Sequence, residues 1–177
     1  MEEISSTEGR QLENEVKKKI EDVIADRMGV KILQEHKILG LSAQWKVDIA
    51  VAAELLLYPG EYSLYLAIIE CKNIGDVGHP YTYHTHMCRA YTELNDLRLN
   101  SKLGAPKFYL MVNRFPSEHE VKKNYHELFK NIGVKMINIH DPSEQTEFEG
   151  EMHSMLRKST FEEQARKLEE LCKIHNR

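Results

Sequence analysis

The sequence predicts a mixed α/β protein in which helices flank a sheet that contains both parallel and antiparallel strands. Apolar runs typical of strands alternate with segments of helical periodicity. Pro59-Gly60 separates two long strand-like runs, which indicates an antiparallel hairpin. The 177 residues, of which 41% are hydrophobic and 29% charged, fit one globular domain spanning residues 1–177.

The N-terminal half is expected to form a helix, three strands and a second helix. Residues 9–28 carry apolar positions at helical spacing, beginning with Leu12 and Val16. The strands are expected at residues 30–39, 46–58 and 62–72. Residues 83–103 return to helical spacing and stop at Gly104.

The C-terminal half is expected to add a strand, a helix, a strand and a last helix. The strands are predicted at residues 107–112 and 134–139, and Ser117 with Glu120 forms a capping-box signature for the helix between them. Tyr125, Leu128 and Phe129 on that helix are expected in the core. Residues 143–155 are interpreted as a polar connector, and residues 160–174 as an amphipathic helix.

Composition excludes several classes of protein. The longest apolar run, residues 49–58, is broken by Glu54 and is too short to span a membrane. The N-terminus lacks the features of a secretory signal, so a cytoplasmic location is expected, and Cys71, Cys88 and Cys172 are expected to be reduced thiols. The net charge of −4 disfavours non-specific coating of nucleic acid, although bound cations can reverse the local sign in a carboxylate-lined cleft.

Glu70 and Lys72 lie at the end of the third predicted strand. Side chains alternate along a strand, so both should share one face with Leu66 and Ile68. A charged pair ending so apolar a strand is costly to bury unless the groups pair with each other or with a metal. The alternative is a strand that emerges into solvent with a weak surface ion pair.

Asp48 lies inside the second predicted strand, where Asp is disfavoured. An edge position would also explain it. However, Asp48 lies 11 residues before Pro59 and Glu70 lies 10 after Gly60, so the two carboxylates should fall nearly opposite each other. They could share a magnesium or manganese ion, with Lys72 orienting or deprotonating the attacking water or stabilising the transition state.

Glu13 is a candidate third carboxylate. On a helical wheel it falls within roughly 50° of the centre of the apolar stripe of the first helix, whereas Glu15 lies well outside it. An acid on the core-facing side of a helix usually has a partner. A favourable interaction with the helix dipole is the alternative.

In kind and order these residues resemble the PD-(D/E)XK phosphodiesterase superfamily, which includes many restriction endonucleases and the archaeal Holliday-junction resolvases. The matching motifs are Gly9-Arg10-Gln11-Leu12-Glu13, Val47-Asp48 and Ile68-Ile69-Glu70-Cys71-Lys72. The resemblance covers residues 9–112 and implies a restriction-endonuclease-like core of helix, three strands, helix and strand, followed by an added helix, strand and helix. Val47 stands where many members have proline.

The resemblance implies that Asp48, Glu70 and the carbonyl of Cys71 hold Mg²⁺, or Mn²⁺ in its place, with support from Glu13 and a catalytic Lys72. We therefore expect a magnesium-dependent DNA endonuclease, of restriction type, acting as a homodimer. Two alternatives stay open. One is a nuclease for Holliday junctions, other structured DNA or RNA, and the other is a non-catalytic interaction module that kept the fold.

The start of the second helix is rich in histidine and tyrosine. His84 and Cys88 would share a helix face, but no second Cys/His cluster has zinc-finger spacing, so a substrate-facing segment is favoured over a zinc site. Ordinary surface positions would explain the same residues equally well. The candidate nucleic-acid contacts are Lys46, Tyr81, Tyr83, His84, His86 and Arg89.

Overall fold

A computed structural model describes residues 2–24, 29–57, 60–74, 80–103, 105–114, 119–157 and 166. It contains the mixed α/β architecture predicted from the sequence. The helices are α1 (Glu2–Ile24), α2 (Pro80–Leu99), α3 (His119–Asn131) and α4 (Pro142–Met155), with a short 3-10 turn η1 (Ser101–Leu103). The strands are β1 (Val30–Leu39), β2 (Gln44–Leu57), β3 (Gly60–Lys72), β4 (Lys107–Val112) and β5 (Val134–Asn138).

The five strands form one mixed sheet in the order β1-β2-β3-β4-β5. The β2–β3 pair is antiparallel, as the hairpin signal predicted, and β1–β2 is antiparallel as well. The pairs β3–β4 and β4–β5 are parallel. β3 is therefore the central strand, with a hydrogen-bonded neighbour on each side. A charged residue on β3 is consequently held in a rigid and largely buried setting.

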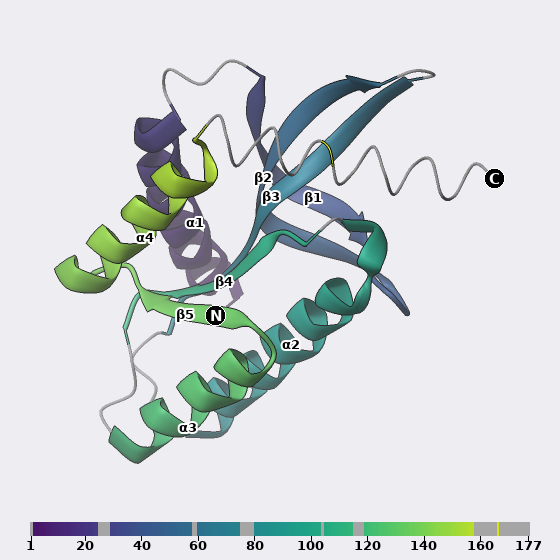
Figure 1. The fold of residues 1–177 in the computed structure, drawn as a ribbon. Coiled ribbons are helices and arrows are strands. Elements are labelled where there is room, and N and C mark those ends of the chain that lie inside the picture. The colour runs from purple at the N-terminus through teal and green to yellow at the C-terminus, as the bar shows by residue number, and fades with distance from the viewer. Residues whose placement is uncertain are drawn as a thin grey trace.

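Helices cover both faces of the sheet (Figure 1). α1 and α4 pack together on one face, and α2 and α3 lie on the other. Each helix pair closes its own hydrophobic cluster. The cluster under α1 and α4 includes Val16, Ile20, Phe148 and Met152, whereas the cluster under α2 and α3 includes Met87, Leu94 and Phe129.

A β-bulge interrupts the regular alternation of side chains along β3. Ala67 pairs with Val51, but Tyr65 pairs with the next residue, Ala52, so Leu66 is the extra residue on β3. Leu66 consequently packs under α1 and α4, while Ile68 packs under α2 and α3. The expectation that Leu66 shares a face with Ile68 and Glu70 was therefore wrong.

The segment interpreted as a polar connector, residues 143–155, is instead the helix α4. Asp141 caps it by accepting hydrogen bonds from the backbone N–H groups of Ser143 and Glu144, and Pro142 occupies the first turn. Phe148, Met152 and Met155 follow at spacings of four and three residues and are buried. Burying each such side chain stabilises the fold by about 1.5–3 kcal/mol, which outweighs the polar composition between them.

Smaller corrections concern helix ends and one core position. α1 begins at Glu2 rather than at residue 9, and the second helix runs from Pro80 to Leu99 before the separate turn η1. Phe129 is buried as predicted, but Leu128 is exposed. The predicted helix at residues 160–174 lies outside the described residues except for Arg166, as do Ser117 of the capping box and Pro59 of the hairpin turn.

The turn between β1 and β2 is held by a buried carboxylate from α2. Asp96 accepts hydrogen bonds from the backbone N–H and hydroxyl of Ser42, from the backbone N–H of Ala43 and from Nε1 of Trp45. A Cβ placed on Gly40 would lie 2.1 Å from Oδ2 of Asp96. Glycine is therefore the residue that lets this turn close around the carboxylate.

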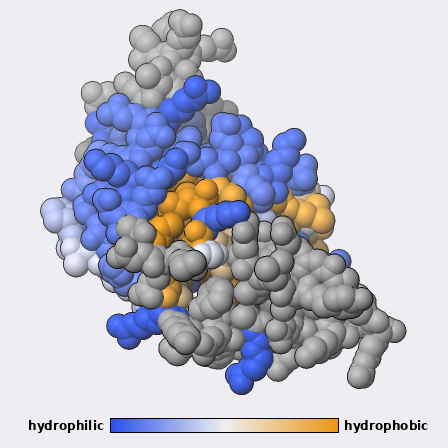
Figure 2. Space-filling model, turned by 90° about the horizontal axis from the view of Figure 1, so that it is seen from above, coloured by the Kyte–Doolittle hydropathy of each residue, from blue (hydrophilic) through white to orange (hydrophobic). Residues whose placement is uncertain are grey.

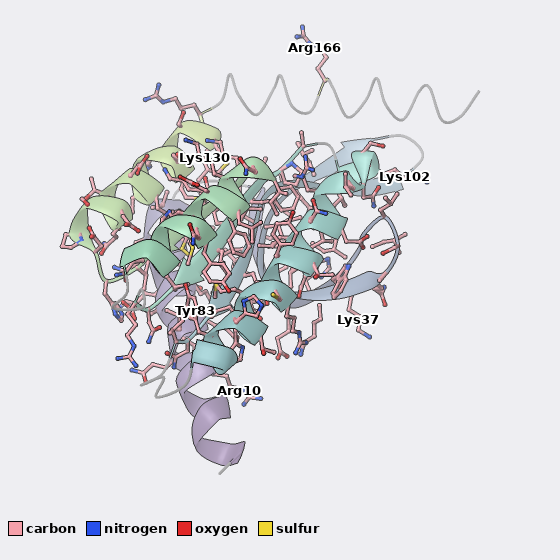
Figure 3. All side chains as sticks on the ribbon, turned by 90° about the horizontal axis from the view of Figure 1, so that it is seen from below. Arg10, Lys37, Tyr83, Lys102, Lys130 and Arg166 are labelled. Carbon is pink, nitrogen blue, oxygen red and sulfur yellow. The ribbon has the colours of Figure 1, made fainter. Side chains whose placement is uncertain are left out.

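Among the coloured residues in Figure 2 most of the surface is hydrophilic, and hydrophobic side chains gather near the centre of the view. Arg10, Lys37, Lys102 and Lys130 point outward from four different elements (Figure 3). Within the described part of the chain, every helix is too short or too polar to cross a membrane.

Candidate active site

Asp48 and Glu70 lie opposite each other on β2 and β3. Ile49 pairs with Ile69 in the antiparallel ladder, so Asp48, one residue before Ile49, faces Glu70, one residue after Ile69. The backbone N–H of Cys71 donates a hydrogen bond of 2.7 Å to Oδ2 of Asp48. This bond holds the Asp48 carboxylate against β3.

Glu70 is buried on the central strand, with 3% of its surface exposed. One carboxylate oxygen contacts the ammonium of Lys72, while the other, Oε2, is buried without a hydrogen-bond partner among the described residues. Burial raises the pKa of Glu70 to about 8, and the nearby Asp48 charge adds to this rise. Glu70 thus lacks enough positive charge around it to remain readily ionised.

Lys72 shares the face of Glu70 and is itself mostly buried, with 14% of its side chain exposed. Burial lowers the pKa of the ammonium, but the carboxylates of Glu70 and Asp48 outweigh that effect and raise it overall. Lys72 therefore stays protonated, as a fixed positive charge beside the two acids.

Asp48 and Glu13 complete the carboxylates that the sequence singled out. Burial raises the pKa of Asp48, although Lys72 and the Cys71 N–H oppose the rise. Glu13 on α1 is half-buried, and burial together with the charge of Asp48 raises its pKa. The Cys71 thiol points into the core under α1, and its pKa is raised well above the usual value by burial, so the side chain remains a neutral thiol.

Sequence reasoning missed Glu93 on α2. Its carboxylate is 3% exposed, and Oε1 has no hydrogen-bond partner among the described residues. Burial raises the pKa of Glu93, the charge of Lys72 lowers it and that of Asp48 raises it further, which places Glu93 in the same electrostatic cluster. On a helical wheel Glu93 lies at the flank of the apolar stripe of α2, so only a search for acids bordering that stripe could have found it.

The candidate nucleic-acid contacts divide into one group that lies near the site, namely His86, Arg89 and Lys46, and the remaining residues. Burial lowers the pKa of His86, and the charges of Lys72 and Arg89 lower it further, so His86 and Arg89 border the site. Lys46 pairs with Glu35 at 3.0 Å, and its charge lowers the pKa values of Asp48 and Glu13.

The others point elsewhere or are not described. Tyr83 is 4% exposed and packs edge-on against Tyr125 of α3, so it is not a surface position (Figure 3). His84 contacts the hydroxyl of Tyr125 and lies 3.4 Å from the sulfur of Cys88, which confirms their shared helix face. The side chain of Tyr81 is outside the described residues.

In the described ranges, no three His, Cys, Asp or Glu side chains stand close enough together to form a ready-made metal site. The arrangement is instead two facing carboxylates, with an ammonium paired to one of them and a further buried acid on α2. When Asp48, Glu70, Glu93 and Lys72 are all ionised, these four side chains carry a net charge of −2. A divalent cation would neutralise that charge.

No family model and no curated protein matches the chain. A crystal structure described as a protein of unknown function, AF1548, is similar to it with a TM-score of 0.41 and 14% identity over 70% of this chain. The chain spans 56% of the length of that protein.

Proposed function

We propose that this protein is a divalent-metal-dependent nuclease that hydrolyses phosphodiester bonds in DNA. The observation that carries the proposal is the underneutralised carboxylate pair, in which Oε2 of buried Glu70 has no hydrogen-bond partner among the described residues other than the facing Asp48 carboxyl. Buried carboxylates without compensating charge are costly, and they persist mainly where a cation or a reaction uses them. The PD-(D/E)XK resemblance supplies the reaction class.

The residues present fit a hard divalent cation. Asp48, Glu70 and the backbone carbonyl of Cys71 offer oxygen ligands of the kind that Mg²⁺ and Mn²⁺ prefer, and Glu13 would support them. Oε2 of Glu70 is one of the buried oxygens that lack a hydrogen-bond partner in the described part of the protein, and it belongs to a proposed ligand. When bound, such a cation supplies positive charge to the phosphate and lowers the pKa of water.

The chain's own groups would perform the remaining tasks. Lys72, held as a cation beside Glu70 and Asp48, would orient the attacking water and stabilise charge that develops on the phosphate. Arg89 and His86 flank the site on α2, where they would contact the DNA backbone. A restriction-type endonuclease acting as a homodimer is the specific form that we propose, because cutting both strands calls for two such sites.

The test is cleavage of supercoiled plasmid with Mg²⁺ or Mn²⁺, with a chelator as the negative control. We expect nicked or linear product from the wild-type chain and none from Asp48→Asn, which keeps the shape of the side chain but not its charge. Glu147→Gln, at an exposed acid on α4, is the matched control and should cleave normally. Absence of cleavage on duplex, junction and single-stranded DNA, together with no metal bound, would refute the proposal.

The contact between Lys72 and Glu70 favours one alternative, a non-catalytic module in which these charges form a structural ion pair. Thermal unfolding separates the two functions. If the site is functional, Asp48→Asn leaves the metal-free protein as stable as the wild type or more stable. A large loss of stability that is independent of metal would favour the structural role.

A further inference from the structure

Glu93 is a buried acid that the proposed chemistry does not yet use. It reaches the site from α2, on the helix flank that also carries His86 and Arg89 at spacings of seven and four residues. Its Oε1 is buried and has no hydrogen-bond partner in the described part of the protein. Among the charges that act on Glu93, that of Lys72 has the largest effect.

In the proposed site, Lys72 and the divalent cation would both contact the carboxylate of Glu70. The Lys72 ammonium contacts Oε1 of Glu70, and Glu70 is one of the two carboxylates that would hold the cation. A cation and an ammonium compete for the same carboxylate, because each repels the other at close range. Lys72 is also mostly buried, so it cannot simply exchange Glu70 for bulk water without moving away from the site.

We propose that Glu93 is the second partner of Lys72, to which the ammonium turns when a divalent cation takes Glu70. The inference rests on the proposed function and deepens it. Glu93 is then a positioning residue that acts through Lys72, keeping the ammonium beside the site in the metal-bound state. With Glu93 included, one divalent cation brings the four buried or mostly buried side chains to neutrality.

Arg89 strengthens this assignment. The charge of Arg89 also lowers the pKa of Glu93. Arg89 lies on the exposed flank of α2, one turn from Glu93. The Glu93 carboxylate is therefore acted on by two cations, the exposed guanidinium of Arg89 and the mostly buried ammonium of Lys72.

A double-mutant cycle on Mn²⁺ affinity tests the proposal. Isothermal titration of Mn²⁺ into the full chain is compared for the wild type, Glu93→Gln, Lys72→Met and the double variant. Glu93→Gln should weaken Mn²⁺ binding by about tenfold when Lys72 is present, a coupling of ordinary size for interacting charges. In the Lys72→Met background the same change should weaken binding by about twofold or less, because no ammonium then competes for Glu70.

Equal weakening by Glu93→Gln in both backgrounds would overturn the proposal, since Glu93 would then act on the cation directly. No weakening in either background would also overturn it and leave Glu93 as a structural acid. Thermal unfolding without metal verifies that each variant is folded, and Glu147→Gln controls for the loss of one negative charge.

The same titrations separate this inference from the proposed function. If the wild type binds Mn²⁺ and Asp48→Asn abolishes binding, the metal site stands even when the cycle shows no coupling, and only the role of Glu93 falls. If the wild type binds no Mn²⁺ at all, both proposals fail together.

Discussion

Two buried carboxylates on α2, Glu93 and Asp96, stand three residues apart in opposite environments. Asp96 accepts several hydrogen bonds from the β1–β2 turn, and the bonds from Trp45 and Ser42 lower its pKa. Glu93 keeps an oxygen without a hydrogen-bond partner among the described residues, and burial raises its pKa. A buried acid with a structural role is surrounded by hydrogen-bond donors, whereas a buried acid whose function is to bind a cation lacks them.

Glu70→Gln should produce the largest effect, on activity. We expect DNA cleavage to fall by roughly 10³-fold or more, because the variant removes a proposed ligand whose charge the reaction needs. The metal-free protein at pH 8 should become more stable, since burial raises the pKa of Glu70 and a neutral amide avoids the burial of its charge, while the charge of Asp48 still stabilises the Lys72 ammonium. Plasmid cleavage and denaturant unfolding measure the two effects, and unchanged cleavage would place the chemistry elsewhere.

Asp96→Ala should show the reverse pattern. Removing the acceptor leaves the donors of the β1–β2 turn unsatisfied, and we expect a loss of about 3 kcal/mol in the free energy of unfolding. Cleavage per folded molecule should persist. Gly40→Ala is a second test of the same clamp, because its new Cβ would collide with the Asp96 carboxylate. Wild-type stability in both variants would contradict the structural role.

The pH dependence of stability should follow the acids of the site. Glu70 has a pKa of about 8 in the folded protein, above the ordinary value of 4.5, so the folded state holds a proton that the unfolded chain has lost. Metal-free stability should therefore be greatest near pH 4.5 and fall as pH rises to 8, by at most about 1.4 kcal/mol per pH unit for each such proton.

The raised pKa values of Asp48 and Glu93 act in the same direction. Urea unfolding across this range, with and without Mn²⁺, measures the effect. Glu70→Gln should flatten the slope, and Mn²⁺ should restore stability at pH 8. If the free energy of unfolding of the metal-free protein rose between pH 5 and pH 8, the result would contradict the conclusion that the carboxylates of the site lack enough positive charge.

The sequence predicted the sheet and the paired carboxylates because both depend on local signals. Alternation and the Pro59-Gly60 signal indicated the β2–β3 hairpin and placed the two carboxylates nearly opposite each other. In the structure Gly60 pairs with Leu57 within the ladder, and the bulge at Leu66 shifts the register so that Asp48 faces Glu70. What the sequence could not predict depends on tertiary contacts. The bulge at Leu66, the approach of Glu93 from α2 and the clamp by Asp96 arise from packing between segments distant in the chain.

The helix α4 was missed for a different reason. Its acids and polar residues outnumber its apolar ones, and only three buried side chains mark the face that packs against the sheet. In the sequence, the Asp141-Pro142 pair is typical of the end of a strand. In the structure the same pair begins a helix, because the Asp side chain caps backbone N–H groups that the first turn leaves free.

Tyr83→Phe should have the smallest effect. The Tyr83 hydroxyl is buried without a hydrogen-bond partner in the described part of the protein, so its removal should leave stability unchanged or raise it by up to about 1 kcal/mol. Tyr109→Phe is the matched control, since that hydroxyl donates to Glu151 at 2.7 Å and its loss should cost about 1 kcal/mol. Because Tyr83 packs against Tyr125 rather than facing solvent, DNA cleavage should be unaffected, and a strong loss of cleavage would instead make Tyr83 a DNA contact.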